Sequence, residues 1–226
     1  MRNLVVVAHP DDEALGFGAT GAGLADRGDE IQTLLMCGGA DLRHRRPSDE
    51  ELLADCRQAH AILGFREPIL RDFPNIRFNT VAHIELVSAV EEAITAFQPD
   101  RIFTHHPGDL NDDHGQVARA TMAAARLAQR REGLPPLRGL YLMEIPSATD
   151  WSFEGLGSDF TPNCFIEAGQ TLDRKLAALA AYRGVMRPYP HPRSVEAIRA
   201  LAAMRGAQSG LDHAEAFQAL HLTELA

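Results

Sequence analysis

The sequence predicts an α/β fold, a Rossmann-like layered arrangement in which a mostly parallel sheet is flanked by helices. Short runs of β-branched and other apolar residues, such as 4–8 and 31–36, are typical of buried parallel strands. Segments with helical patterns separate these runs, and strands that alternate with helices predict parallel pairing. Two polar clusters directly follow strands, at the edge of the sheet where α/β proteins bind ligands.

The chain is expected to form one domain over residues 1–226, with a mainly helical C-terminal portion from about residue 170. Ser48 and Gly64 carry the signals that begin and end a helix, and Gly28 ends an earlier one. The predicted strands are 4–8, 31–36, 68–70, 101–104 and 139–143, and the predicted helices are 12–27, 48–63, 80–97 and 113–129.

Composition excludes several classes of protein. There are 31 acidic residues against 22 lysines and arginines, so nucleic acid, which needs a basic face, is not an expected partner. The apolar run 4–8 is too short for a membrane span or a signal sequence, and a cytoplasmic location is expected. The cysteines Cys37, Cys56 and Cys164 lack the spacing of a disulfide framework or a thiolate zinc site. A homo-oligomer is compatible with all of this.

The first polar cluster is His9-Pro10-Asp11-Asp12-Glu13, directly after the first strand. Pro10 ends the strand, and the three-residue spacing of His9 and Asp12 can bring an imidazole and a carboxylate to one metal ion. Asp11, between them, can accept a proton from water that a metal has activated. Asp12 taken alone is more simply explained as a helix cap, but the whole string favours a metal site.

The second polar cluster runs from Thr104 to His114 and holds three histidines and three aspartates. Two histidines with one carboxylate leave an open coordination position, as hydrolytic zinc requires. His114 is the candidate third ligand because it stands near a helix start. Asp113 either caps that helix or orients an imidazole.

Gly16, Gly18 and Gly21 fit the G-x-G-x-x-G spacing of dinucleotide-binding proteins. In those proteins the glycines directly follow the strand, so that a helix N-terminus meets a pyrophosphate. Here three acidic residues intervene and would repel a phosphate. The glycines are therefore interpreted as close packing of a helix against the sheet.

The two clusters resemble the PIG-L/LmbE-like family of N-acetyl-sugar deacetylases. The marks of that family are the string at 8–13, at a strand end, and a later Asp-His pair near a helix start, here 113–114. Segments 104–111, 144–151, 190–194 and 214–217 are similar to one bacterial branch of the family, so the resemblance covers nearly the whole chain.

The resemblance implies a Rossmann-like fold, one catalytic zinc and a defined set of roles. His9, Asp12 and His114 correspond to the zinc ligands of the family, and Asp11 corresponds to its general base. Iron in place of zinc stays open, because this ligand set suits both metals.

The sequence departs from the family pattern at Asn111, where many members carry a histidine that assists the oxyanion. An amide donates a hydrogen bond but cannot deliver a proton. Asn111 is still expected at the catalytic site, with His106 or His191 as residues that could compensate. Asn75 and Asn79 stand where aspartates are expected; they either alter the preferred sugar or bond to their own loop.

Other residues are expected around the centre or at the substrate. Asp109, Asp113 and Arg193 form this group; the planar fork of Arg193 suits a phosphate or carboxylate, although a rigid loop is the plainer explanation. Trp151 is either a platform for a sugar or a packing residue. The run 43–46, rich in arginine, is either a solvated face or a lid over an anionic substrate.

The predicted protein is a zinc-dependent hydrolase that removes an N-acetyl group from a small sugar or sugar conjugate, of the N-acetylglucosamine type. Zinc-activated water would attack the amide carbonyl, and zinc would stabilise the oxyanion. The alternatives are a zinc amidase acting on another small amide, and a binding protein that keeps the metal without turnover.

Overall fold

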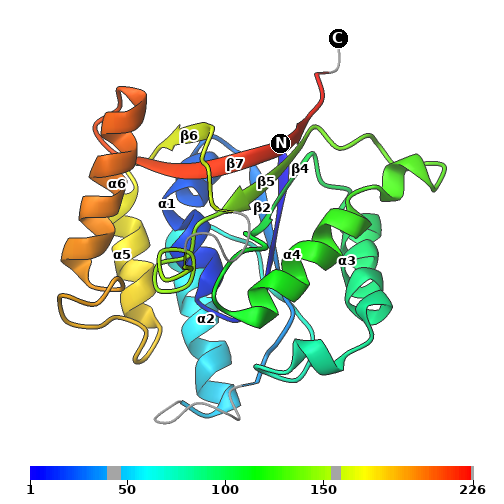
Figure 1. Cartoon of the computed structure of the whole chain (residues 1–226), viewed down its shortest axis with the longest axis horizontal. Coiled ribbons are helices and arrows are strands. Elements are labelled where there is room, and N and C mark those ends of the chain that lie inside the picture. The colour runs from blue at the N-terminus through cyan, green and yellow to red at the C-terminus, as the bar shows by residue number, and fades with distance from the viewer. Residues whose placement is uncertain (40–46, 154–158, 225–226) are drawn as a thin grey trace.

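The computed structural model describes residues 1–39, 47–153 and 159–224, which form a seven-stranded sheet covered by helices (Figure 1). The strand order is β3-β2-β1-β4-β5-β7-β6. The first five strands in this order pair in parallel, and β7 pairs antiparallel with both β5 and β6. The bounds are β1 (Arg2–Val7), β2 (Glu30–Leu35), β3 (Ile69–Leu70), β4 (Arg101–His105), β5 (Gly139–Met143), β6 (Cys164–Glu167) and β7 (Ala214–Leu222).

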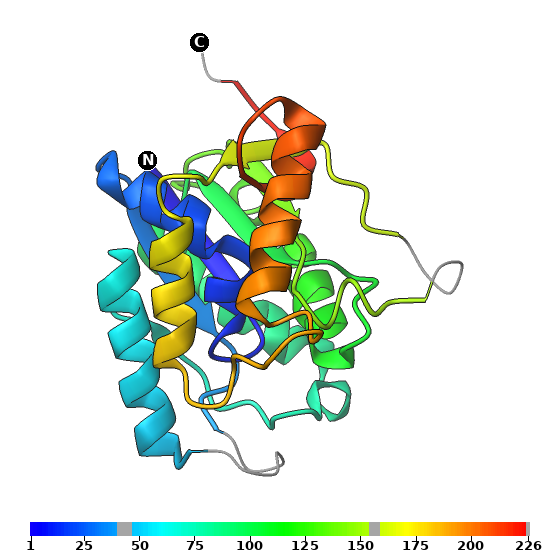
Figure 2. The same cartoon turned by 90° about the vertical axis from the view of Figure 1, so that its left-hand side faces the viewer.

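Helices lie on both faces of the sheet, as the two perpendicular views show (Figures 1 and 2). Helices α1, α2, α5 and α6 share one hydrophobic core with the sheet, and α3 and α4 share the other. The bounds are α1 (Asp12–Asp26), α2 (Asp49–Leu63), α3 (His83–Phe97), α4 (Asp112–Ala124), α5 (Leu172–Ala181) and α6 (Val195–Ser209), with 3₁₀ turns η1 (Phe78–Thr80) and η2 (Leu127–Gln129).

The continuous apolar run in β1 is explained by these two cores. Val5 and Val7 belong to the core under α1, whereas Leu4 and Val6 belong to the core under α3. Because successive side chains of a strand point to opposite faces, a central parallel strand must be apolar at every position. The layered α/β fold expected from the sequence is confirmed.

The glycines of α1 serve close packing, as the sequence analysis favoured. A Cβ atom at Gly21 would lie 2.4 Å from Cζ of Phe65 and 2.8 Å from Cδ1 of Phe17. A Cβ atom at Gly16 would lie 2.7 Å from Cδ1 of Ile145. Gly16 therefore packs closely against the end of the sheet, since a Cβ atom there would also lie 2.8 Å from Sδ of Met143 in β5. Gly21, by contrast, makes room for the ring of Phe65.

Two strands of the C-terminal half were not predicted. The expected mainly helical portion from residue 170 contains α5 and α6 but also the nine-residue strand β7, and β6 precedes it. The β7 sequence is rich in alanine, glutamate, glutamine and leucine, which favour helices, so pairing with β5 and β6 overrides local propensity. The helix predicted to end at residue 129 ends at Ala124 and is followed by η2.

The arginine-rich run 43–46 lies outside the described residues. Within the part of the chain that the structure describes, none of the helices combines the length and the apolar character that a membrane crossing requires.

Two glycine substitutions in α1 test the packing. Gly21→Ala is expected to lower the free energy of unfolding by about 1–3 kcal/mol, because the new methyl group overlaps two phenylalanine rings. Gly23→Ala is the matched control: its nearest neighbour is Oγ1 of Thr171 at 3.8 Å, and it should raise stability by up to about 1 kcal/mol. Urea unfolding measures both, and equal effects would contradict this account of the helix.

Candidate metal centre

The two polar clusters meet at the carboxyl ends of β1 and β4. These strands pair with each other, and β1 also pairs with β2 on its other side. The chain therefore leaves β1 and β4 toward opposite halves of the sheet, which makes this edge the topological switch point where α/β proteins bind ligands. The turn after β1 carries His9 to Asp12, and the loop after β4 leads to His114 at the start of α4.

The turn between β1 and α1 has an uncommon backbone. Asp11 has φ 108° and ψ −28°, a conformation that costs an L-residue about 1–3 kcal/mol. Asp11 also occupies the N-cap position of α1, but its side chain makes no cap hydrogen bond. Asp12 is the first residue of the helix and not its cap; its Oδ2 atom accepts a hydrogen bond from the backbone N–H of His9 at 3.0 Å. The capping explanation for Asp12 is therefore wrong.

His9, Asp12 and His114 converge into one buried cluster. Oδ2 of Asp12 lies 3.4 Å from Nδ1 of His9 and 3.3 Å from Nε2 of His114. One ligand atom from each of the three residues lies within 4.8 Å of the others, and each residue is 1% exposed. Three side chains at such separations can hold a metal ion and leave a position open for substrate or water.

Each histidine of the cluster is held through its other ring nitrogen by a carboxylate. Nε2 of His9 lies 3.0 Å from Oδ2 of Asp113, and Nδ1 of His114 lies 2.9 Å from Oδ2 of Asp109. Such outer carboxylates fix the tautomer and the orientation of a metal-binding imidazole. Asp113 is itself fixed by the backbone N–H groups of Ile76 and Phe78, so of its two expected roles it orients an imidazole.

One buried nitrogen of the cluster makes no hydrogen bond within the part of the chain that the structure describes, and a cation could fill that role. Among the described residues, Nδ1 of His9 has no hydrogen-bond partner, although the side chain is buried. An unsatisfied buried polar atom is costly, and coordination to a metal removes that cost. The donor set of two imidazoles and one carboxylate also matches the preferences of zinc and iron(II).

The charges of the cluster also favour a positive charge at this position. Burial alone would raise the pKa of Asp12, but the neighbouring imidazoles of His114, His9 and His105 hold it well below its usual range. Burial would lower the pKa of His114, yet Asp12 and Asp109 raise it to about 9. The carboxylates therefore stabilise a positive charge at this position, which a metal ion can supply in place of the proton.

His105 lies against the cluster, and with Asp109 and His114 it forms a second, overlapping group of possible metal ligands. Its Nε2 atom accepts a hydrogen bond from the backbone N–H of Ala8 at 2.8 Å, which places the ring proton on Nδ1. Its ring stacks on that of His114 with centroids 3.8 Å apart. Burial and the neighbouring His114 lower its pKa well below the usual value, so it is a neutral platform.

Arg193 reaches this region from the loop before α6. Its Nη1 atom lies 3.3 Å from Oδ2 of Asp11, and its Nε atom donates to Oγ of Ser147 at 2.8 Å. Of the expected group, Asp109 and Asp113 contact the histidines of the cluster, and Arg193 contacts Asp11. Arg193 and Asp11 are 182 residues apart in the sequence.

The remaining predicted residues lie nearby, in different settings. Asn111 is the N-cap of α4, with its side-chain oxygen accepting from the N–H of Asp113. Nδ1 of His106 accepts from the N–H of Gly108, and burial lowers the pKa of this histidine. His191 packs its ring against the exposed Trp151, with centroids 5.4 Å apart. Burial and the nearby Arg193 lower the pKa of His191.

The loop before α3 places Asn75 beside the cluster. Asn75 is 1% exposed, and both polar atoms of its side chain lack a hydrogen-bond partner among the described residues. It directly precedes Ile76, whose N–H is bonded to Asp113. This setting does not agree with an asparagine that bonds to its own loop. Asn79 lies in η1.

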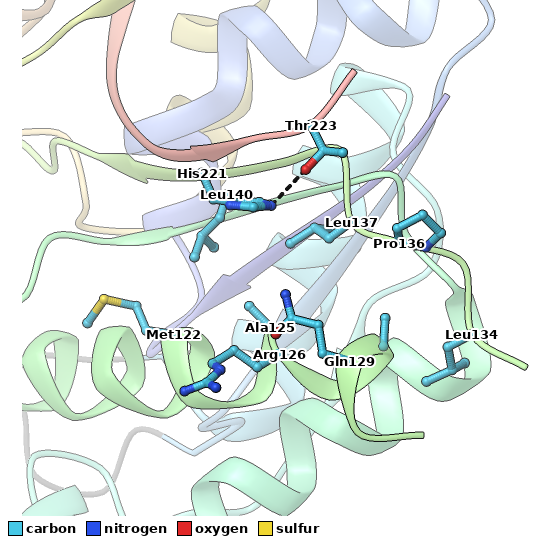
Figure 3. Close-up of a pocket in the computed structure, with 11 residues that line it drawn as sticks. Met122, Ala125, Arg126, Gln129, Leu134, Pro136, Leu137, Leu140, His221 and Thr223 are labelled. Carbon is cyan, nitrogen blue, oxygen red and sulfur yellow. Dashed lines mark hydrogen bonds between the residues drawn. The ribbon is translucent and has the colours of Figure 1, made fainter. Parts of the chain in front are cut away.

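A separate cavity of about 430 Å³ lies at the opposite end of the sheet (Figure 3). Its lining comes from Met122 of α4, from the segment just after α4, from the loop 134–137, from Leu140 of β5, and from His221 and Thr223. Because β5 runs parallel to β4, its first residues lie at the edge away from His114. None of the residues that line this cavity belongs to the predicted site.

The fold and the cluster define an α/β protein with a candidate metal centre at its topological switch point. A family model described as PIG-L, GlcNAc-PI de-N-acetylase, matches residues 4–125. This stretch is more than half of the chain and includes both polar clusters. The chain belongs to the PIG-L family.

Relatives agree with this assignment. "Uncharacterized deacetylase YaiS" of Escherichia coli K12 is 34% identical over 131 residues, which are 54% of this chain and 67% of YaiS. The N,N'-diacetylchitobiose deacetylase of Pyrococcus horikoshii superposes with a TM-score of 0.75 at 18% identity, covering 97% of this chain and 83% of its own. GalB of Pseudomonas putida KT2440, a 4-carboxy-2-hydroxymuconate hydratase, superposes with a TM-score of 0.79 at 19% identity over 100% of both chains. At such identities the two structures show the shared fold alone.

Removing a ligand or its outer partner should have graded effects on metal content. His114→Ala is expected to abolish binding of a divalent metal, and Asp109→Ala to weaken it about 10- to 100-fold by releasing the His114 ring. Asp112→Ala, at an exposed neighbouring aspartate, is the control and should bind as the wild type does. Metal titration with elemental analysis checks this; full metal content in His114→Ala would exclude the cluster as the binding site.

Proposed function

We propose that this protein is a zinc-dependent N-deacetylase that releases acetate from an N-acetylated sugar or sugar conjugate. The observation that carries the proposal is the buried triplet of His9, Asp12 and His114, with a carboxylate behind each imidazole and an unpartnered nitrogen facing inward. Membership of the PIG-L family supplies the reaction class. Iron is the alternative metal, since the ligand set suits it equally.

Zinc bound by these three side chains would activate a water molecule and polarise the amide carbonyl. Asp11 is the residue that we assign to proton transfer, because it follows His9 and precedes Asp12 in the same turn and its carboxylate is buried. Its contact with Arg193 restricts the orientation of that carboxylate. A general base fixed in this way contributes more than a freely rotating one.

The leaving amine needs a proton, and Asn111 cannot deliver one. We propose that Asp11 gives the leaving amine the proton that it took from water. No further acid is then needed to protonate the amine. His106 and His191 remain candidates for hydrogen bonding to the substrate. Nδ1 of His191 accepts from the backbone N–H of Arg193. The backbone carbonyl of His106 accepts from the N–H of Asp109, so both histidines are linked to residues near the cluster.

Three residues support a polar, sugar-like substrate. Asn75 offers a buried amide whose donors and acceptor are unused by the described residues, as a site for sugar hydroxyl or acyl groups would. The indole of Trp151 is 46% exposed next to His191, which suits stacking on a sugar ring. Arg193 adds a positive charge beside Asp11, which suits a substrate that carries a phosphate or carboxylate.

The alternatives predict different products. An amidase acting on another small amide would release an acid other than acetate, because the ligand triplet recognises a carbonyl and not its substituents. A binding protein would hold the metal and the substrate without releasing either product.

Acetate release from a panel of N-acetylated sugars tests the proposal, beginning with N-acetylglucosamine and N,N'-diacetylchitobiose and the zinc-loaded protein. Asp11→Asn should lower kcat about 100- to 10,000-fold with its metal content unchanged, because the amide cannot accept the proton. Asp112→Asn should retain wild-type turnover. Acetate release that survives in Asp11→Asn would contradict the role of Asp11, and metal binding without any release would favour the binding protein.

A further inference from the structure

A second buried polar cluster lies behind the turn that carries Asp11. It consists of Glu13 from α1, Cys56 and His60 from α2, and Tyr182 at the end of α5. All four side chains are at most 2% exposed. Nothing in the proposed reaction uses these residues directly, so their burial together needs a separate explanation.

Glu13 connects this cluster to the backbone of Asp11. Its Oε1 atom accepts a hydrogen bond from the hydroxyl of Tyr182 at 2.5 Å and lies 3.6 Å from Nε2 of His60. Its Oε2 atom accepts from the backbone N–H of Asp11 at 3.1 Å. The carboxylate of Glu13 thus links α2 and α5 to the residue with the positive φ angle.

The cluster also has the donor types of a metal site, because one ligand atom each from Glu13, Cys56 and His60 falls within 4.8 Å. It differs from the first cluster in one respect. Among the described residues, no buried nitrogen or oxygen of Glu13, His60 or Tyr182 lacks a hydrogen-bond partner, whereas Nδ1 of His9 does. His60 completes the pattern by placing Nδ1 3.0 Å from the carbonyl oxygen of Arg66. The hydrogen bonds of the second cluster are therefore complete without a metal ion.

The network is balanced in charge. Burial would lower the pKa of His60, but its contacts with Cys56 and with the Glu13 carboxylate raise it to about 10. A protonated His60 can donate from both ring nitrogens and neutralise Glu13. A buried carboxylate held by a cation and a hydroxyl keeps a fixed position, because breaking the set would leave a charge unpaired in the core.

We infer that Glu13, held by Tyr182 and His60, is a positioning residue that keeps the Asp11 backbone in its left-handed conformation and so aims the Asp11 carboxylate. The hydrogen bond from the Asp11 N–H offsets part of the cost of this conformation. The inference rests on the proposed function only for the statement that Asp11 carries out proton transfer. The geometry of the turn can be measured without any substrate.

A matched pair of α5 variants separates positioning from stability. Tyr182 and Thr171 stand at opposite ends of α5, and each donates a buried hydroxyl to α1: Tyr182 to Glu13, and Thr171 to the carbonyl oxygen of Ala19 at 2.7 Å. Tyr182→Phe and Thr171→Val each remove one such hydrogen bond with little change in shape. Only the first should disturb the turn at Asp11.

The first measurement is hydrogen exchange of the Asp11 amide in the metal-loaded protein. Tyr182→Phe is expected to speed this exchange by about tenfold relative to Thr171→Val, because the acceptor Glu13 is no longer fixed. The second is turnover of N-acetylglucosamine. Tyr182→Phe should lower kcat about 10- to 100-fold with KM and metal content unchanged, as expected for a displaced catalytic group, and Thr171→Val should leave kcat unaltered.

Variants of Glu13 test whether a conservative replacement preserves activity and whether Glu13 acts through Asp11. Glu13→Gln should keep more activity than Glu13→Ala, because its amide oxygen can still accept from the Asp11 N–H although it no longer neutralises His60; Glu13→Ala can do neither. In an Asp11→Asn background, Glu13→Ala should cause no further loss of kcat, since the two residues act as one unit.

The outcomes distinguish the two proposals. If the wild type releases no acetate but Asp11 exchange responds to Tyr182→Phe and not to Thr171→Val, the positioning role stands and the proposed function fails. If the wild type is active and Tyr182→Phe changes exchange and kcat no more than Thr171→Val does, the positioning role is overturned. A second equivalent of zinc that persists in His114→Ala and is lost in Cys56→Ser would also overturn it, in favour of a second metal site.

Discussion

The attraction between the Asp12 carboxylate and the two imidazoles beside it is the interaction on which the rest of the site depends. Asp12 is almost wholly removed from water, so its charge must be neutralised locally. His9 and His114 come from opposite sides of the switch point and meet only because β1 and β4 are adjacent. A cation bound at this point would stabilise three side chains that are otherwise buried at a cost.

The buried groups around this triplet fix the orientation of its side chains. Asp109 and Asp113 hold the imidazoles, His105 stacks beneath His114, and backbone N–H groups of η1 and its preceding turn hold Asp113. The Asp11 side has its own support in Glu13 and Arg193. Rigid outer contacts of this kind keep reacting groups in place, and a misplacement of about 1 Å can cost 100-fold in rate.

Local patterns were enough to predict the parallel strands and the helices between them, since the two cores make β1 apolar at successive positions and one of them buries α1. They were not enough for β7, whose alanine-rich sequence becomes a strand only through pairing with β5 and β6. Because the carboxyl ends of parallel strands lie at the same edge of a sheet, the sequence was enough to predict that His9, Asp12 and His114 lie at one edge. The contacts of Asp11 with Arg193 and of Glu13 with Tyr182 link residues more than 160 positions apart, and no local pattern encodes them.

X-ray absorption at the zinc edge of the purified, zinc-loaded protein tests the central claim most directly. This account predicts two imidazole nitrogens and one carboxylate oxygen at about 2.0–2.2 Å, with no sulfur neighbour. A sulfur at about 2.3 Å would place the metal at Cys56 and would contradict the assignment of His9, Asp12 and His114 as the metal centre.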